Sequence, residues 1–532
     1  MKIKNQFKLS GIIIFSLFFN TAFCQNAVYE NPIIHQDFSD PDVIRVGDTY
    51  VMTSSSFNHV PGLPLLTSTD LVNWKLNGYA LNRLVPEDYY SNVRHGCGVW
   101  APSIRFHQNE FYIYYPDPDF GIYLIKSKSI NGPWSKPILV LAGKGLIDPC
   151  PLWDDNGKAY IVHAYAGSRA GIKSILAVKE MSADGSKIIS DGKVVYDGHQ
   201  DDPTVEGPKF YKYNGYYYIF APAGGVGTGW QIVLRSKSVY GPYERKVAMS
   251  QGQSKVNGPH QGAWIQTQNG EDWFIHFQDK EVYGRIAHLQ PMRWENNWPV
   301  IGVDKDSDGI GEPVIKYSMP SSKIKSLESS FNQQVAIDDF NEGKLNVNWQ
   351  WQANSHDAWY FLKPHQLRLY ARCFSDSLKN LYDVPNLLLQ KFPAEQFEAT
   401  TKLTFNPLVE NEKCGLIVFG YDYSFIGLQK MGKMIFIVNN TYKKAAASNP
   451  IEVKVYDTVK NNQPVYLRVK MLDDHTCKFS YSFEDKNYIE LQDVFIPKQG
   501  KWVGAKIGIF ANGEIKNNDC GSADFEWFKI KK

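Results

Sequence analysis

Short apolar and aromatic runs, each introduced by a tight polar turn, recur along the first three fifths of the chain. The Asn-Gly and Gly-Asp pairs in these turns tolerate positive φ and favour β-hairpins, and the aromatic run that follows each turn is typical of a buried strand. No segment shows the period of an amphipathic helix. The pattern predicts an all-β protein. Five copies of it occur, at residues 47–52, 108–113, 156–161, 214–219 and 269–274.

A second repeat accompanies three of these units, at residues 68–74, 127–134 and 236–243. It places a polar strand end, a turn and an aromatic residue further along each unit. Successive units lie about 50 to 60 residues apart, which is room for about four strands, as in a propeller blade. We therefore predict a five-bladed β-propeller over residues 28–317. The alternative is a β-sandwich with accidental internal similarity, which five copies of linked motifs disfavour.

The rest of the chain follows a different pattern. Residues 318–335 are polar and predict a linker. From residue 336 to residue 532 the chain shows short strands of alternating polar and apolar residues, such as 366–370 and 506–510, without a helical period. This pattern predicts a β-sandwich as a second domain.

The first 24 residues predict a signal peptide. Three lysines precede an apolar stretch at residues 12–23 that is too short to span a bilayer. Ala22 and Cys24 place small residues where a signal peptidase inspects the chain, so we expect cleavage before Gln25 and export to the periplasm or the extracellular space. A lipid anchor on Cys24 is the alternative, although Phe23 is a poor neighbour for that modification. No later segment is apolar enough to span a membrane.

Composition narrows the possible partners. The 532 residues carry a formal net charge of +2, with 43% hydrophobic and 21% charged residues, as in a globular protein in water. No run of Lys and Arg is dense enough to bind nucleic acid. Aromatic residues reach 14%; we assign most of them to sheet packing and some to stacking on sugar rings. Export permits disulfides, but for Cys97 and Cys150 we favour buried thiols over a bond.

One residue with binding or catalytic chemistry precedes each of the five aromatic runs at a similar distance. These residues are Asp40, Trp100, Asp148, Glu206 and His260. Each is expected at the start of its blade's innermost strand, and innermost strands line the central channel of a propeller. We therefore predict that the five meet at one end of the channel, in a pocket that binds an oligosaccharide or polysaccharide.

Three carboxylates at one channel mouth indicate chemistry. Like charges in a confined site raise one pKa, and such sites are catalytic more often than chance predicts. Cleavage of a glycosidic bond needs one carboxyl group to protonate the leaving oxygen and another to activate water or attack the sugar. Taken singly, each of these residues has a structural explanation. Asp40 or Asp148 is more often a turn residue, Trp100 or His260 is more often a core residue, and Glu206 could cap a loop. Their shared position in the five repeats favours a functional site instead.

The same motifs resemble glycoside hydrolase family 43 across residues 30–302. The resemblance lies in Asp-Pro at 40–41, Val-Trp-Ala-Pro-Ser-Ile at 99–104, Ile-Asp-Pro at 147–149, Val-Glu-Gly-Pro at 205–208 and His-Gln-Gly at 260–262. The second domain is similar to the concanavalin A-like sandwich appended to many β-xylosidases of this family. Its matching runs are residues 338–341, 349–351 and 523–525.

This resemblance implies an enzyme that inverts the anomeric carbon in a single displacement. Asp40 would be the general base, Glu206 the general acid, and Asp148 the residue that orients Glu206 and tunes its pKa. Inversion leaves room for a water molecule, so the carboxyl groups of Asp40 and Glu206 are expected roughly 6.5–9.5 Å apart.

The resemblance also assigns four further residues. Phe57 and Trp100 match positions that wall the pocket, and Arg285 matches an arginine that reaches substrate hydroxyls. His260 matches a histidine at the pocket floor, which faces a bound calcium in some members of the family. No cofactor is implied as a requirement. Surface charge is the favoured interpretation of Asp339 and Asp524, and a structural calcium held by their oxygens is the alternative.

Several alternatives stay open at this point. The implied activity is exo-acting release of terminal xylose or arabinose, as a β-xylosidase, an α-L-arabinofuranosidase or both, with the sandwich closing one side of the pocket. Residues 39–42 lack the His-Pro that precedes the base in many β-xylosidases, and residues 58–62 replace a more aromatic run, so the preferred sugar is open. Asp42 shares a strand face with Asp40 and competes for the role of base. Other hypotheses are a non-catalytic glycan-binding propeller, a retaining fructosidase, for which Ser39 is the wrong residue, and a glycosidase for another sugar such as galactose.

Overall fold

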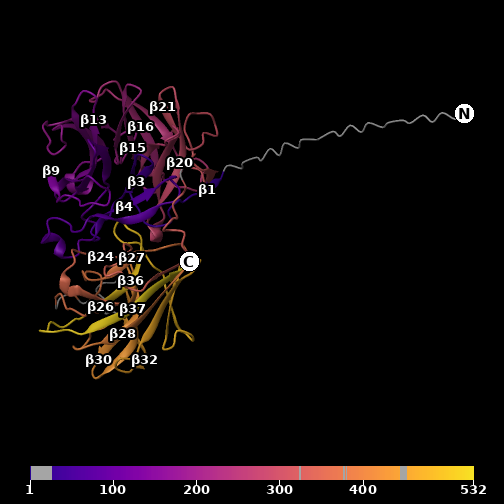
Figure 1. Ribbon diagram of the computed structural model, residues 1–532. Helices are drawn as coiled ribbons and strands as arrows, with labels where there is room; N and C mark the ends of the chain where they lie inside the picture. Colours follow the sequence, from indigo (N-terminus) through magenta and orange to yellow (C-terminus); the bar gives the residue numbers. More distant parts are fainter. Residues whose placement is uncertain (2–26, 323–324, 376–377, 379, 444–451) are drawn as a thin grey trace.

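The computed structural model describes residues 1, 27–322, 325–375, 378, 380–443 and 452–532. Residues 2–24 of the expected signal peptide lie outside this set. The described chain forms two β-rich lobes, with the propeller above and the sandwich below in Figure 1. A single four-residue α-helix, α1 (Gly167–Ala170), occurs among the described residues. None of the helices in that part of the chain is long and apolar enough to cross a membrane.

The upper lobe is a five-bladed propeller, as the repeats predict. Each blade is an antiparallel sheet of four strands in sequence order. The blades are β2 (Asp42–Val46), β3 (Thr49–Thr53), β4 (Gly62–Ser68) and β5 (Lys75–Leu81); β6 (Ser103–His107), β7 (Glu110–Asp117), β8 (Gly121–Ser127) and β9 (Ile138–Ala142); β10 (Leu146–Trp153), β11 (Ala159–Tyr165), β12 (Ile175–Met181) and β13 (Lys193–Asp197); β14 (Lys209–Tyr213), β15 (Tyr216–Ala223), β16 (Trp230–Ser236) and β17 (Glu244–Met249); and β18 (His260–Gln266), β19 (Asp272–Asp279), β20 (Arg285–Glu295) and β21 (Trp298–Ile301).

The hairpin turns have the backbone that their sequences predict. Between β14 and β15, Asn214 and Gly215 have φ values of 47° and 72°, the positive angles that suit a tight hairpin and that Asn and Gly tolerate. The ends of the propeller are fastened together by β1 (Val28–Glu30), which pairs with β22 (Lys316–Ser318). Each blade buries its apolar side chains against its neighbours; Val43 and Met52 of the first blade pack in one cluster with Ile275 and Leu289 of the last.

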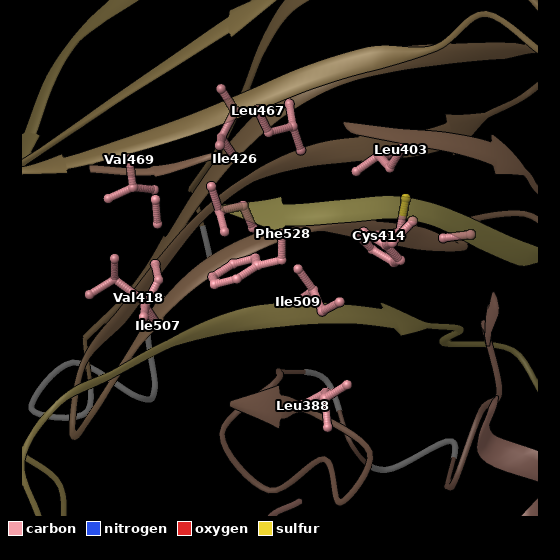
Figure 2. Close-up of a cluster of buried hydrophobic side chains, with 14 of the residues drawn as sticks. Leu388, Leu403, Cys414, Val418, Ile426, Leu467, Val469, Ile507, Ile509 and Phe528 are labelled. Atoms are coloured by element: carbon pink, nitrogen blue, oxygen red, sulfur yellow. The ribbon is translucent and has the colours of Figure 1, made fainter. Parts of the chain in front are cut away.

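The lower lobe is a sandwich of two antiparallel sheets, as predicted. In β33 (Val465–Met471) alternate residues are buried, which is the period of a strand with one face on a core. Figure 2 shows that core, where Leu403 and Phe528 of one sheet meet Ile426 and Ile509 of the other. One sheet has the order β25 (Tyr360–Lys363), β26 (Gln366–Tyr370), β37 (Ser522–Lys531), β28 (Phe397–Asn406), β33, β34 (Cys477–Ser482) and β35 (Ile489–Phe495), with β23 (Val335–Asp338) on β37; the other has the order β24 (Gln350–Trp351), β27 (Leu388–Lys391), β36 (Lys506–Asn512), β29 (Lys413–Phe419), β30 (Tyr423–Met431), β31 (Met434–Tyr442) and β32 (Glu452–Val459).

The loop at residues 58–62 joins the two lobes. Val60 forms a β-bridge with Trp351 of the sandwich, and the Asn58 side chain donates a hydrogen bond to the carbonyl oxygen of Gln352, at 2.8 Å. The sequence suggested that this loop bears on sugar recognition. In the structure these two of its residues contact the sandwich, so the loop's departure from the family pattern affects the domain interface.

Candidate active site

Left-handed backbone conformations turn two of the predicted acids out of regular strand geometry. Asp40 has φ of 56° and Asp148 has φ of 55°, a region that few non-glycine residues occupy. Pairing between β10 and β11 shifts register between Ile147 and Cys150, and pairing between β18 and β19 shifts between His260 and Gly262. Such bulges re-aim side chains. Irregular backbone, either a positive φ or a β-bulge, therefore occurs at Asp40, Asp148 and His260, which are positions that the sequence repeat aligns.

The predicted position at a strand start needs one correction. His260 is the first residue of β18, and Asp40, Trp100 and Glu206 lie just before β2, β6 and β14. Asp148, however, is inside β10, because the bulge there breaks the pairing around it while the strand continues. The prediction that Asp148 lies at the start of its strand was therefore wrong.

One hollow gathers six of the seven residues predicted to form the site. We call it the acidic hollow and define it by its lining: Asp40, Phe57, Trp100, Ala101, Ile147, Asp148, Glu206, Val226, Gln261, Arg285 and Trp502. The seventh predicted residue, His260, is buried beside it, with Nε2 3.5 Å from Oε1 of Glu206.

Asp40 is buried and held by donors on two sides. Its Oδ2 accepts a hydrogen bond from the Ser55 hydroxyl at 2.5 Å, and its Oδ1 lies 3.3 Å from Nη1 of Arg285. Arg285 is itself nearly buried, and its guanidinium stands 4.9 Å above the Phe277 ring. The carboxylate of Asp40 thus acts as an acceptor in a fixed orientation.

Glu206 and Asp148 are adjacent acids with different surroundings. The backbone N–H of Gly207 donates to Oδ2 of Asp148 at 2.7 Å. Burial raises the pKa of Asp148, and this hydrogen bond opposes the shift. Burial also raises the pKa of Glu206, and the negative charge of Asp148 raises it further. The amide of Gly207 stabilises the ionised form of Asp148, so this hydrogen bond favours placing a shared proton on Glu206.

The Glu206 side chain is 34% exposed, and its exposed part faces the acidic hollow. A ligand in that hollow would therefore contact the Glu206 carboxyl group directly.

His260 is a neutral neighbour of Glu206. Neither ring nitrogen has a hydrogen-bond partner among the described residues. Burial, with the nearby charge of Arg285, lowers the pKa of His260 to about 3. His260 is therefore neutral near neutral pH, and its contact with Glu206 is not a salt bridge.

Aromatic rings wall the acidic hollow. Phe57 and Trp100 meet edge to face, 6.3 Å apart, and the Trp100 indole N–H donates to the carbonyl oxygen of Gly96 at 2.9 Å. Phe57 is held by a β-bridge to Val99. A glycine is required next to this bridge, because a Cβ at Gly98 would lie 2.3 Å from the Phe57 carbonyl oxygen.

The third wall comes from the sandwich, as the resemblance implied, but the residue that forms it was not predicted. Trp502 lies in the loop between β35 and β36 of the sandwich, with φ of 64° and 41% of its surface exposed. Its ring is 6.0 Å from that of Trp100, and Arg285 lies 5.8 Å above it. No sequence signal marked Trp502, because it belongs to no repeat.

Asp37 connects this sandwich loop to the site. Its Oδ1 accepts the backbone N–H of Arg285 and its Oδ2 accepts that of Gly504, both at 3.0 Å. One buried carboxylate therefore ties the strand that carries Arg285 to the loop that carries Trp502.

Asp42, the rival for the role of base, has a structural position. It is fully buried, and its Oδ2 accepts hydrogen bonds from the Ile104 N–H and from Arg105, each at 2.7 Å. Lys209 lies 3.7 Å from its other oxygen. Asp42 does not line the acidic hollow. Arg105 also donates to the Cys150 sulfur, and Cys150 is a buried thiol that forms no disulfide with Cys97.

Replacing Asp42 by Asn should lower the free energy of unfolding by about 3–5 kcal/mol, since it leaves the buried Lys209 and the largely buried Arg105 without their counter-charge. Urea unfolding followed by fluorescence measures this loss. Asp48→Asn, in the exposed turn between β2 and β3, is the control and should stay within about 0.5 kcal/mol of the wild type. Equal stability of the two variants would show that the buried pairing contributes nothing.

The acids considered for calcium have other partners. Both oxygens of Asp524 accept hydrogen bonds from Arg368 at 2.6 Å, while Asp339 lies 3.3 Å from His365. Each of the two acids is therefore paired with a different basic side chain. In the described part of the chain no three His, Cys, Asp or Glu side chains are arranged to hold a metal ion.

A propeller with three carboxylates and an arginine around one hollow, fused to a sandwich, defines a class of carbohydrate-active protein. A comparison with known protein families supports this assignment. The family "Glycosyl hydrolases family 43" matches residues 29–299, and "Beta xylosidase C-terminal Concanavalin A-like domain" matches residues 337–531. The chain belongs to glycoside hydrolase family 43 and is a hydrolase of glycosidic bonds, which confirms the resemblance found in the sequence.

Relatives cover nearly all of the chain. A putative β-xylosidase of Xylanibacter ruminicola is 38% identical over 484 residues, 91% of this chain and 86% of that protein. A non-reducing end α-L-arabinofuranosidase of Bacteroides ovatus is 29% identical and covers 99% of each chain. The crystal structure of a xylan β-1,4-xylosidase from Bacillus halodurans aligns with a TM-score of 0.82 at 23% identity, over 94% of this chain and 100% of that one. This last likeness shows the shared two-domain fold.

Proposed function

We propose that this protein is an inverting, exo-acting glycosidase that releases terminal xylose or arabinose from plant-type glycans. The observation that best supports this proposal is the acidic hollow. Asp40, Asp148 and Glu206 line one small space together with Arg285 and three aromatic rings. The names of the relatives, β-xylosidases and an arabinofuranosidase, support a pentose as the released sugar.

Each of the three acids has a distinct role in this proposal. Glu206, protonated because burial and Asp148 raise its pKa, gives its proton to the glycosidic oxygen as the C1–O bond breaks. Asp40 removes a proton from a water molecule, whose oxygen forms the new bond to C1 from the opposite face. Asp148 holds its negative charge beside Glu206 and so keeps the acid protonated. The separation of roughly 6.5–9.5 Å between the Asp40 and Glu206 carboxyl groups stays a prediction.

The walls support an exo mode of action. Trp502 lines the acidic hollow from the sandwich, next to walls formed by the propeller. A space bounded on several sides accepts the end of a glycan more readily than its middle. Arg285, beside Asp40, is placed to donate hydrogen bonds to sugar hydroxyls. The N-terminal residues support export of the enzyme, to the periplasm or beyond, where such glycans occur.

Asp148→Asn should move the alkaline limb of the pH profile to lower pH. The reaction needs protonated Glu206, so kcat/KM falls as pH rises through the pKa of that group. Without the charge of Asp148, that pKa is raised less and deprotonation begins earlier. The pH dependence of kcat/KM on an aryl xyloside measures the shift. Asp155→Asn, whose side chain is 88% exposed, is the control. An unmoved limb in Asp148→Asn would remove Asp148 from its proposed role.

Trp502→Ala should raise KM for xylosides about tenfold, the loss of about 1.4 kcal/mol that an aromatic contact supplies. Because the ring is exposed at a loop tip, the melting temperature should hardly change. Trp502→Phe, which keeps a flat apolar face, should restore most of the affinity. Steady-state kinetics with all three proteins decides; an unchanged KM in Trp502→Ala would mean that the sandwich does not contribute to sugar binding.

A panel of aryl glycosides tests the proposed function. We expect hydrolysis of the β-D-xyloside, the α-L-arabinofuranoside or both, at a kcat/KM at least about a hundredfold above that for the β-D-galactoside. Faster cleavage of the galactoside would assign another sugar. Binding of xylose without hydrolysis of any substrate would instead indicate a glycan-binding propeller.

A further inference from the structure

A second polar hollow lies where the propeller, the segment between the domains and the sandwich meet. We call it the junction hollow. It shares no residue with the acidic hollow. Gln36 and Tyr79 line it from the propeller, Gln333 from the intervening segment, and Gln390, Lys391 and Lys532 from the sandwich.

The lining of the junction hollow is basic and rich in hydrogen-bond donors. Two lysines and four amide side chains contribute to it, the fourth amide being that of Asn348, and no aspartate or glutamate among the described residues does. Pockets of this chemistry complement negatively charged ligands, since both ammonium and amide N–H groups donate to oxyanions.

Lys391 is the central group. It stands at the end of β27, with Nζ 3.5 Å above the Phe38 ring. No hydrogen bond or ion pair joins this amine to any other described residue. Burial lowers the pKa of Lys391 to about 7; Asp37 opposes that shift, and the charge of Lys506 adds to it. Lys391 is half-buried. An amine that is partly withdrawn from water and has no acceptor is unfavourable in its charged form, so an anionic partner would stabilise it.

Asp37, the acid whose charge acts on Lys391, does not supply that partner. Asp37 already accepts the backbone N–H groups of Arg285 and Gly504 with its two oxygens. Within the junction hollow, the side chains of Gln390 and Tyr79 also form no hydrogen bond to another described residue, although Gln390 is only 9% exposed. Lys532 makes one bond, from its amine to the carbonyl oxygen of Phe331, and has donors to spare.

We propose that the junction hollow binds a small oxyanion, with Lys391 and Lys532 as its charged ligands and the surrounding amides as additional donors. The ligand is either an inorganic anion such as phosphate or the carboxylate of a sugar acid. Both ligands present negatively charged oxygen atoms that accept hydrogen bonds from these donors. Binding would join residues of both domains around Lys391, and it is independent of glycosidase activity because no residue of the acidic hollow takes part.

Isothermal titration calorimetry on the full chain tests this site, with sodium phosphate, sodium D-glucuronate and neutral D-xylose as probes at constant ionic strength. We expect saturable 1:1 binding of at least one anion, and the tighter of the two identifies the source. Lys391→Met should weaken anion binding at least tenfold. It should leave the affinity for xylose, which reports on the acidic hollow, unchanged.

Two further variants complete the design. Gln333 is exposed, so Gln333→Glu is expected to fold normally and to weaken anion binding several-fold by placing a negative charge in the junction hollow. The Gln333→Glu variant tests the proposal even if Lys391→Met fails to fold. Lys470→Met, on the exposed face of β33, is the matched control and should bind as the wild type does. No saturable binding of either anion, or anion binding unaffected by Gln333→Glu and by folded Lys391→Met, would overturn the proposal.

Discussion

Replacing Glu206 by Gln should lower kcat/KM on xylobiose by about 10²–10⁴-fold, the usual contribution of a general acid. A glutamine has nearly the same shape but has no proton to transfer to the leaving sugar. The effect should be much smaller on an aryl xyloside whose phenol is acidic, because that leaving group departs without protonation. Steady-state kinetics on the two substrates measures both values.

The contrast between the two substrates makes this test specific to an acid. Damage to the site in general would slow both reactions alike. The alkaline limb of the pH profile should also disappear in Glu206→Gln, since the group that loses its proton is gone. Glu87→Gln, at an exposed glutamate paired with Arg83, should leave both activities intact. Full activity of Glu206→Gln on xylobiose would exclude Glu206 as the acid.

Asp40→Asn should lower kcat on both substrates by about 10²–10⁴-fold, since activation of water is needed whatever the leaving group. Asparagine keeps the size of the side chain and tolerates the left-handed backbone found at residue 40. The protein should therefore stay folded, with a melting temperature within a few degrees of the wild type. Kinetics with the aryl xyloside and thermal unfolding together measure these effects.

The comparison with Asp42→Asn sharpens this prediction. The two aspartates are two residues apart, yet one lines the acidic hollow beside Arg285 and the other is paired with Arg105. Asp40→Asn should lose activity and keep stability; Asp42→Asn should lose stability and keep activity per folded molecule. The reverse result would exchange the two roles.

The fold was predictable because a propeller repeats itself. Each blade needs a hairpin turn, an aromatic strand and a polar strand end, so the same residues recur at similar spacing and reveal both the number of blades and the positions that meet at the channel. Asp40, Asp148 and Glu206 were found in this way. Their shared position in five repeated units was more informative than any one motif, because an Asp-Pro pair alone is usually a turn.

The resemblance implied that the sandwich closes one side of the pocket, but the residues that join the two domains were not predictable from the sequence. Trp502 reaches the acidic hollow from a sandwich loop, and Asp37 ties that loop to Arg285. Neither residue belongs to a repeat, and only the docking of two separate lobes brings them together. The bulge at Asp148 was missed for a related reason: register shifts depend on backbone pairing, and the sequence pattern records only which residues alternate.

The configuration of the first sugar released tests the central proposal most directly. Hydrolysis of an aryl β-D-xyloside is followed by proton NMR from the first seconds, before mutarotation mixes the anomers. A single displacement by water, with Asp40 as base and Glu206 as acid, predicts that α-D-xylose appears first and β-D-xylose only later. Initial release of β-D-xylose would mean net retention and would contradict the assignment of Asp40 as the residue that activates water.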